Sequence, residues 1–434
     1  MSLTRKLSQA TVMFLALVCT IVVALASPAL ATTLSMSLIG QTGDTQVGYP
    51  IGIAKAGNRV FTADNGGPNI SMIDVSAPQT PTVIDVLDLS SAPFNARSLS
   101  VLGDKIAYVG NADRVGVVTG ALTNHLAFAG ATPTSGAGAL PANSGPYAIQ
   151  TRGNYAYTAN RNPAGGNSLS VINISDAANP VQTGITPSSG PGAFPAAVNL
   201  FDSACDLVLV GNFAYVVNRE NGQVVSVDIS DPTNPHVVAA SPLAGQQGGP
   251  AAGSIFWSIS TNGSTLAVTD QGANEIHFFN LGDAAHGVPA QLLSSLSTIG
   301  QPTSTSFSGD YLYLSKFDGN AIVGSISLID CTDPANPAFL ISTPAPPTNG
   351  TLDDAYPEQV VSQDGLAFFT DSGHGFGMGV VEVQGIVWPT PTPTPDADLA
   401  KTGLSDVPAV LIFALLAFSA GVGILLSRRG HVRK

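Results

Sequence analysis

Side chains suited to binding a ligand are spread over most of this chain of 434 residues. Arg97 carries a permanent cation, Trp257 has a broad aromatic face, and Asp206 and Glu358 carry carboxylates. A cation, two carboxylates and an aromatic platform together suit a sugar or a peptide. We therefore predict a ligand-binding site formed by Arg97, Asp206, Trp257, Glu358 and His374.

Signatures of the common catalytic centres are absent from the sequence. The chain has no Gly-x-Ser-x-Gly elbow, no His-Glu-x-x-His, no Cys-x-x-Cys and no P-loop. Its 6 histidines do not cluster along the chain. We therefore predict no catalytic residue, no metal and no cofactor, although a site assembled from single residues of different repeats would leave no such signature.

One pattern recurs between about residues 33 and 387: an extended segment, a Gly-Asn or Gly-Asp turn, an aromatic-rich strand, a polar loop, a β-branched strand and a Pro-rich turn. Residues 153–180 and 211–235 are two clear copies. The Gly-Asn pair predicts a type I′ hairpin, in which both central residues have positive φ. The Asp-Pro-x-x-Pro segment predicts a second turn, because proline fixes φ and Asp caps the turn.

Aligning these hairpins predicts seven units, each about 46 to 58 residues long, as expected of propeller blades or solenoid turns. Their turns lie at Gly57, Gly103, Gly153, Gly211, Gly263, Gly309 and Asp364. Four short strands in each unit, without helical periodicity, favour a propeller. The predicted fold is an all-β, seven-bladed β-propeller covering residues 32–387.

These repeats resemble the LVIVD repeat, a β-propeller family related to the YVTN-type surface propellers. The most specific part of the resemblance is the run Ile-Asp-Ile-Ser-Asp-Pro-x-x-Pro, which is well kept at 228–235 and 330–337 and degraded at 74–81. The second unit lacks the Asp-Pro turn after Gly120, so its outer strand is not identified. Similar propellers include enzymes of the lactonase or lyase kind, which keeps an enzymatic alternative open.

The seventh unit has three recognisable strands, at 358–362, 366–370 and 380–384, and no fourth. A strand-like segment at 33–40 precedes the first unit. We predict that this N-terminal segment completes the last blade, so that the ring closes without a free edge.

The alignment also predicts which side chains surround the mouth of the channel. The positions six residues before each hairpin turn are Ile51, Arg97, Tyr147, Cys205, Trp257, Thr303 and Glu358, with Asp206 and Gln359 beside two of them. Loops nearby add Arg161, Arg219, Glu220, Lys316 and His374. Two alternatives stay open: Trp257 packs between blades, and Arg97 forms a structural ion pair with Glu358.

Asp or Asn closes five of the seven second strands, at Asp64, Asn160, Asn218, Asp270 and Asp371. Such a ring could hold metal ions, but these side chains usually cap turns locally, and we favour that interpretation.

The N-terminus has the features of an exported chain. Arg5 and Lys6 precede an apolar run at 11–26, and a small-x-small site ends at Ala31. This order predicts a signal peptide at 1–31 that is cut between Ala31 and Thr32. Cys205 and Cys331 then remain, and because they lie on non-adjacent units we predict two buried thiols.

The C-terminus combines a Pro/Thr-rich linker at 388–398, the pentapeptide LAKTG at 399–403, an apolar segment at 407–426 and a basic tail. About twenty apolar residues can cross a bilayer as a helix, and the basic tail predicts a cytoplasmic C-terminus. The order resembles the cell-wall sorting signal of Gram-positive surface proteins, here in its LAxTG form. The resemblance implies that a sortase cuts between Thr402 and Gly403 and joins Thr402 to a cell-wall amine. A simple single-span membrane anchor is the alternative.

The formal net charge of −13 argues against nucleic acid or an anionic membrane surface as a partner. Export and anchoring predict an extracellular protein on the cell surface. We favour a non-catalytic binding or adhesion module for glycans or proteins. The alternatives are an extracellular lactonase or lyase, using Glu358, Arg97 and His374, and a purely structural wall protein.

Overall fold

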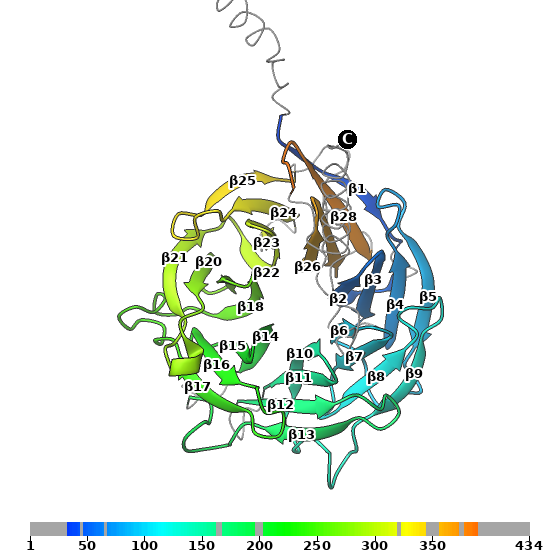
Figure 1. Cartoon of the computed structure of the whole chain (residues 1–434). Helices are drawn as coiled ribbons and strands as arrows, with labels where there is room; N and C mark the ends of the chain where they lie inside the picture. Colours follow the sequence, from blue (N-terminus) through cyan, green and yellow to red (C-terminus); the bar gives the residue numbers. More distant parts are fainter. Residues whose placement is uncertain are drawn as a thin grey trace, which may run out of the picture. The chain divides into compact units, whose positions relative to one another are not determined.

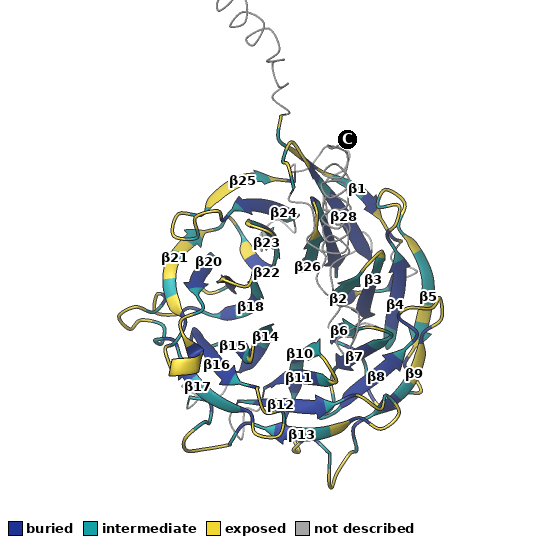
Figure 2. Ribbon diagram, viewed as in Figure 1, coloured by how far each residue is buried: buried dark blue, intermediate teal, exposed yellow. Residues whose placement is uncertain are grey.

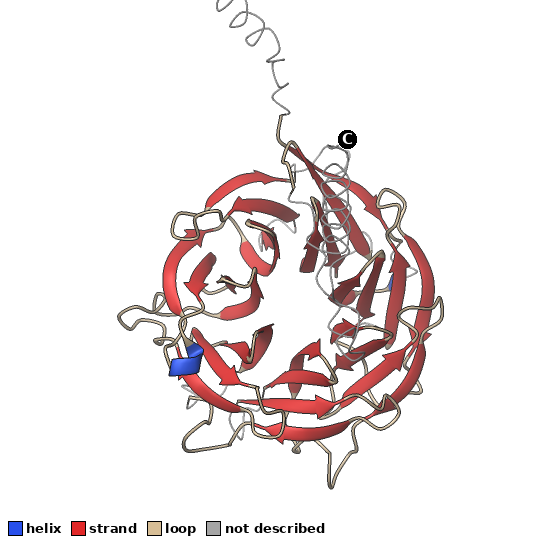
Figure 3. Cartoon of the chain, in the orientation of Figure 1, coloured by secondary structure: helices blue, strands red, loops and turns tan. Residues whose placement is uncertain are grey.

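The computed structural model describes residues 33–43, 47–64, 67–161, 167–195, 203–318, 323–343, 356–372 and 377–388. Seven four-stranded antiparallel sheets are arranged in a ring around a central channel (Figure 1). The described elements are strands, apart from a 3₁₀ turn at Ala284–His286 (Figure 3). The prediction of an all-β, seven-bladed propeller is therefore confirmed.

The first three blades follow the chain from the channel outward. They comprise β2–β5 (Pro50–Ala56, Arg59–Asp64, Asn69–Asp74, Thr82–Asp88), β6–β9 (Ser98–Leu102, Lys105–Val109, Val115–Thr119, Ala127–Ala131) and β10–β13 (Pro146–Arg152, Tyr155–Asn160, Ser168–Asn173, Val181–Ile185).

Blades 4 to 6 have the same order. They comprise β14–β17 (Ala204–Val210, Phe213–Asn218, Gln223–Asp228, His236–Ala240), β18–β21 (Phe256–Thr261, Thr265–Asp270, Glu275–Asn280, Gln291–Ser297) and β22–β25 (Gln301–Ser308, Tyr311–Asp318, Val323–Asp330, Ala338–Ser342).

Blade 7 is built from both ends of the described chain. It contains β26 (Pro357–Gln363), β27 (Leu366–Asp371), β28 (Met378–Gln384) and β1 (Ser35–Gln41), in that order from the channel to the rim. β1 pairs with β28 in antiparallel register, from Ser35 opposite Gln384 to Gln41 opposite Gly379. Figure 1 shows the blue β1 on the outer side of the orange β28.

The hairpins between first and second strands differ from the predicted turn type. Gly57, Gly153 and Gly211 have φ of 54°, 58° and 53°, but the asparagines that follow them do not have positive φ. A positive φ at the first central residue alone is the pattern of a type II′ turn, so the type I′ prediction is wrong there. In blade 7 both central residues, Asp364 and Gly365, have positive φ, which is the type I′ pattern.

Each interface between neighbouring blades contains one cluster of buried apolar side chains. Between blades 7 and 1, for example, Val47, Ile53 and Val60 pack against Phe368 and Val380. The middle strands are buried on both faces, as the dark blue centres of the blades show (Figure 2). The propeller core is therefore a ring of seven interfaces, and blades 7 and 1 pack together as the other neighbours do.

The Pro-rich turns of the repeat connect blades at the rim. A Cβ on Gly184, in the outer strand of blade 3, would lie 2.3 Å from the carbonyl oxygen of Pro232 in the turn of blade 4. A Cβ on Gly40, in β1, would likewise lie 2.1 Å from the carbonyl oxygen of Pro78 in the turn of blade 1. Outer-strand glycines therefore let these turns approach closely, and Gly40 gives β1 the same contact that Gly184 gives β13.

The structure supplies the outer strand of blade 2 that the sequence does not identify. β9 pairs with β8, and its Gly130 would place a Cβ 2.2 Å from the carbonyl oxygen of Ala178 in blade 3. The carboxylate of Asp104 accepts backbone N–H bonds from Gly120 and Leu122 at 3.2 and 2.8 Å. Asp104 therefore holds the connection that replaces the missing Asp-Pro turn.

Several sequence predictions fall outside the described residues: the signal peptide at 1–31, most of the linker at 388–398, and the sorting signal with its apolar segment at 399–434. Within the described part of the chain, no helix has the length and apolar character needed to cross a membrane. Trp388, which we assigned to the linker, stacks on Tyr313 with ring centroids 6.1 Å apart.

Met36 tests the contribution of β1. Its side chain is buried between blades 6 and 7, whereas the neighbouring Ser37 is exposed. We expect Met36→Ala to lower the free energy of unfolding by about 2–5 kcal/mol, because it leaves a cavity in the core. Ser37→Ala should change it by less than about 0.5 kcal/mol. Urea unfolding of the full chain measures both, and equal midpoints for the two variants would contradict the packing of β1.

Candidate functional site

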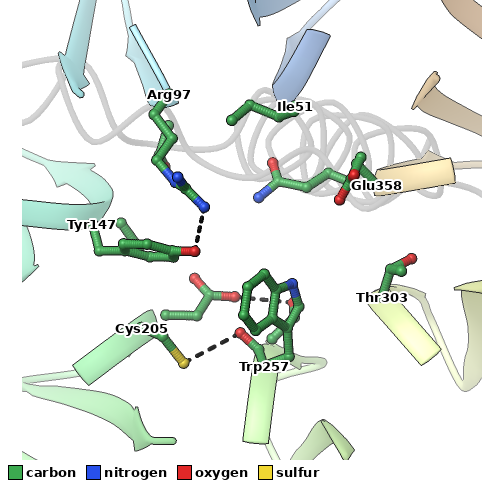
Figure 4. A pocket seen from close by; sticks show the side chains of 12 residues that line it. Ile51, Arg97, Tyr147, Cys205, Trp257, Thr303 and Glu358 are labelled. Carbon is green, nitrogen blue, oxygen red and sulfur yellow. Dashed lines mark hydrogen bonds between the residues drawn. The ribbon is translucent and has the colours of Figure 1, made fainter. Parts of the chain in front are cut away.

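The inner strands of all seven blades begin at one face of the ring, where a cavity of about 230 Å³ opens. We call it the mouth cavity. All seven residues that the repeat alignment places around the channel mouth line it, together with Asp206 and Gln359. Figure 4 shows the seven converging on one space: Ile51, Arg97, Tyr147, Cys205, Trp257, Thr303 and Glu358.

Arg97 is held against Tyr147, from the next blade. The central carbon of its guanidinium lies 4.0 Å from the centroid of the Tyr147 ring, and a terminal nitrogen donates a hydrogen bond to the Tyr147 hydroxyl (Figure 4). Among the described residues no carboxylate forms an ion pair with Arg97. The alternative of a structural ion pair with Glu358 is therefore not what the structure contains.

Trp257 extends this contact into a row of two adjacent rings with a guanidinium at each end. Tyr147 and Trp257 meet edge to face with their centroids 6.2 Å apart. The guanidinium of Arg219, from blade 4, lies 4.7 Å from the centroid of the Trp257 ring. Because each guanidinium is stacked on an aromatic ring, the cations have fixed positions at the rim of the mouth cavity.

Asp206 lies deeper, where the mouth cavity meets the channel. Its carboxylate accepts hydrogen bonds from the backbone N–H groups of Leu207 and Ile259, at 2.8 and 3.0 Å, and from the Ser258 hydroxyl at 3.0 Å. Loss of solvent around the carboxyl outweighs these bonds and raises the pKa of Asp206 to about 6. This group therefore exchanges its proton near neutral pH.

Glu358 lies on the opposite side of the mouth cavity from Tyr147 (Figure 4). Its carboxylate accepts a hydrogen bond of 2.8 Å from the Ser372 hydroxyl. The side-chain oxygen of the adjacent Gln359 accepts the backbone N–H of Ile53 at 3.1 Å. Both side chains are thus oriented by neighbours while they line the cavity.

Cys205 is buried, and its thiol points to the backbone oxygens of Phe256 and Trp257 at 3.5 and 3.4 Å. Burial raises the pKa of this thiol far above its ordinary value, so the reactive thiolate is not formed at neutral pH. Cys331 is also buried and unpaired. The prediction of two buried thiols is confirmed.

The mouth cavity continues into the channel as a space of about 250 Å³ that Asp206 also lines. Hydroxyl groups of neighbouring inner strands meet along it, with 2.8 Å between the side-chain oxygens of Ser260 and Thr305 and 2.9 Å between those of Ser306 and Ser362. The channel wall therefore combines serine and threonine hydroxyl groups with apolar side chains, and Asp206 provides a titratable group at its entrance.

The loop residues Arg161, Arg219, Glu220 and Lys316 do not line the mouth cavity. His374 lies outside the described residues. Lys316 lies by Phe339, with its amine 5.5 Å from the ring centroid, and lines a separate groove with Ile299.

Aspartates that close second strands cap local turns. The carboxylates of Asp64 and Asp270 accept the backbone N–H groups of Gly67 and Gly272, three and two positions later, at 3.1 and 2.9 Å. Asp64, Asp270 and Asp371 also accept the backbone N–H of the residue fifteen positions earlier, at 3.1, 2.8 and 2.6 Å, which ties the loop before the inner strand to the second strand. Within the described ranges, no group of three or more His, Cys, Asp or Glu side chains is placed to hold a metal ion. The capping interpretation therefore explains these residues.

Sequence reasoning placed Tyr147 at the channel mouth and Arg161 in a nearby loop, but left both out of the predicted ligand-binding set. The Arg161 guanidinium lies 5.7 Å from the centroid of the same Tyr147 ring that Arg97 covers. Both arginines line a second hollow of about 450 Å³ beside the mouth cavity, which we call the side groove. The available signal was that Arg97 and Tyr147 occupy corresponding positions of adjacent units, and that Arg161 directly follows the second strand of the same unit as Tyr147.

Comparison with known proteins supports the repeat. The LVIVD repeat family matches residues 148–186 and 202–240, which contain most of blades 3 and 4. The chain is thus similar to that family over these two segments. No curated protein matches the chain in sequence.

Solved structures with the same fold have very different sequences. The β-propeller domain of Cps50 (Swd1) from Myceliophteria thermophila has a TM-score of 0.57 and 12% identity, covering 81% of this chain and 100% of that one. A protein from Lactobacillus plantarum has a TM-score of 0.53 and 15% identity, and the match covers 70% of this chain and 86% of that one. A candidate 6-phosphogluconolactonase from Bacteroides fragilis has a TM-score of 0.52 and 12% identity, and the match covers 79% of this chain and 89% of that one. At such identities the likeness concerns the fold alone.

The pKa of Asp206 predicts a pH effect on stability. Because the folded-state pKa is raised from 3.8 to about 6, protonation of Asp206 stabilises the fold. This contribution is fully present below pH 3.8 and is lost as the pH rises through about 6. We expect the thermal midpoint of the parent, measured relative to Asp206→Asn by calorimetry, to fall across this range. Parallel pH profiles for the two proteins would contradict the raised pKa.

Proposed function

We propose that this chain is a cell-surface protein whose propeller binds glycans or proteins at the mouth cavity, without catalysing a reaction. The observation that carries the proposal is the convergence of Arg97, Tyr147, Trp257 and Glu358, from four different blades, on one cavity. These residues depart from the repeat, so blade geometry alone does not explain their types.

The contacts within the site favour recognition. Stacking on Tyr147 orients the Arg97 guanidinium before any ligand arrives, and the Ser372 hydroxyl orients Glu358. Groups that are ordered in advance lose less conformational entropy on binding, which improves affinity. Trp257 is only partly buried and offers apolar surface at the rim of the same cavity.

Export and anchoring are part of the proposal and rest on the sequence. A signal peptide at 1–31 and the sorting signal at 399–434 support an extracellular propeller held at the cell surface. A sortase and a cell-wall amine would be its partners during anchoring, and the apolar segment at 407–426 would hold it in the membrane before cleavage.

An extracellular enzyme of the lactonase kind is the second candidate, and Asp206 is the observation that favours it. A carboxyl with a pKa of about 6 can donate and accept a proton near neutral pH. Arg97 would stabilise a developing negative charge in the same cavity. Hydrolysis of a lactone by the full chain, lost in both Asp206→Asn and Glu358→Ala, would favour this candidate.

The binding proposal predicts that the mouth cavity is required for ligand capture. We expect the full chain to bind members of an array of immobilised glycans and matrix proteins. The combined variant Arg97→Ala, Trp257→Ala and Glu358→Ala should lose this binding, because it removes the cation, the aromatic surface and a carboxylate together. Surface plasmon resonance with the captured chain measures both proteins.

The matched control is Arg152→Ala, which removes an arginine stacked on Tyr157 at the far end of the inner strand of blade 3. It should bind as the parent does, and thermal midpoints confirm that the variants are folded. Binding that survives in the triple variant would move the site away from the mouth cavity. An array without any bound ligand would favour the enzyme or a purely structural wall protein.

The anchoring proposal predicts a defect in Thr402→Ala. A sortase that recognises LAxTG forms its covalent link through the threonine carboxyl, and substitution of the threonine should prevent cleavage. We expect the parent in the cell-wall fraction and the variant in the membrane fraction of the same host. If both stay in the membrane fraction, the C-terminus is a simple single-span anchor.

A further inference from the structure

We propose that the ligand is an acidic saccharide, and that its anionic group is bound in the side groove between Arg97 and Arg161. This inference rests on the proposed binding function and names the chemical class of the ligand. It starts from the side groove, which lies between blades 2 and 3 and has a volume of about 450 Å³.

The side groove and the mouth cavity share a wall. Arg97 and Tyr147 line both, so the two hollows adjoin at these two side chains, and a ligand that reaches over them would occupy both. The mouth cavity alone, at about 230 Å³, is smaller than the roughly 300–1,000 Å³ of most small-molecule sites. The combined space therefore suits an oligomeric ligand that has one unit in each hollow.

The two arginines leave donors available for an anion. Arg97 directs one nitrogen to the Tyr147 hydroxyl, and the described residues provide no carboxylate partner for either Arg97 or Arg161. A guanidinium has five N–H donors in a planar fork that matches a carboxylate or a phosphate. The side groove thus has two cations near one ring, and no carboxylate among the described residues is paired with either.

Asp113 lines the same groove but is already used by the chain. Its carboxylate oxygens accept the backbone N–H groups of Asn143 and Gly145 at 2.6 and 2.8 Å. These bonds hold the loop before β10, so Asp113 acts on the backbone and forms no ion pair with the groove arginines. Asp113 therefore leaves the guanidinium groups of Arg97 and Arg161 available to an external anion.

The formal charge of −13 does not prevent this binding. The Debye length at physiological ionic strength is about 8 Å, so charges elsewhere on the propeller are largely screened from the groove. Arg219, stacked on Trp257, adds a third cation at the rim, with its side-chain nitrogen 3.7 Å from Glu220. Three guanidinium groups therefore contact the two aromatic rings, and Glu220 offsets the charge of the third.

The lining of the mouth cavity favours a saccharide as the carrier of the anion. Hydroxyl, amide and carboxyl groups surround Trp257: Ser98, Asp206, Ser258, Thr303, Glu358 and Gln359. A polyhydroxylated ring can exchange many hydrogen bonds with such a wall while its apolar face packs against an indole.

The test compares acidic saccharides with their own neutral forms. Full chain is titrated calorimetrically with oligogalacturonate and with its methyl ester, and then with phosphomannan and dephosphorylated mannan. We expect one acidic form to bind at least about tenfold more tightly than its neutral partner, a difference of ~1.4 kcal/mol. The pair that shows the difference identifies the anion as carboxylate or phosphate.

Two variants and a control locate the anion. Arg97→Gln and Arg161→Gln should each weaken binding of the acidic form at least about tenfold and leave the neutral form unchanged. Arg152→Gln removes an arginine that also stacks on a tyrosine, Tyr157, but lies outside both hollows, and it should bind as the parent does.

Two results would overturn the inference, and they differ in what they say of the proposed function. Equal affinity for acidic and neutral forms would leave the binding function intact and remove the anion from it. A chain that ignores all four saccharides but captures a matrix protein would keep the binding module and exclude a saccharide ligand. If a variant unfolds, the affinities of the parent chain for the acidic and neutral saccharides still decide whether the ligand needs an anionic group.

Discussion

The fold depends on one constraint: every blade has two apolar faces, and each face needs a neighbour. The seven buried clusters each join a different pair of adjacent blades, so the propeller has no core outside its interfaces. An open row of blades would expose one face at each end to water, at a cost that grows with the apolar area left uncovered. Packing of Phe368 and Val380 against Val60 removes both ends at once.

Closure also determines where chemistry can occur. Inner strands that start at the same level bring one residue from each blade to the channel mouth, whatever that residue is. The repeat then fixes the backbone through turns such as the one that Asp270 caps, and leaves the mouth positions free to vary. Arg97 and Trp257 occupy such positions, which is how residues 160 positions apart in the chain line one cavity.

Much of the fold was predictable because the repeat is local. Hairpin positions, blade number and the residues at the mouth all follow from counting along the chain. The turn type was not predictable, because the Gly-Asn pair is compatible with more than one type of hairpin turn. The φ of the asparagine depends on the twist of the finished sheet. Asp104 holds the connection that replaces the Pro-rich turn of blade 2 through two backbone contacts, with Gly120 and Leu122, that the repeat pattern does not predict.

The candidate site was predictable in its membership but not in its contacts. Stacking of Arg97 on Tyr147 depends on side-chain rotamers and on the spacing between blades 2 and 3, neither of which a sequence pattern encodes. Trp388 shows the same limit: composition assigns it to the linker, whereas its ring packs on Tyr313. That contact has a mechanical consequence. A pull on the chain beyond Trp388 first loads this stack and then β28, which is held along both edges by β27 and β1. Two ladders of hydrogen bonds would share such a force in shear.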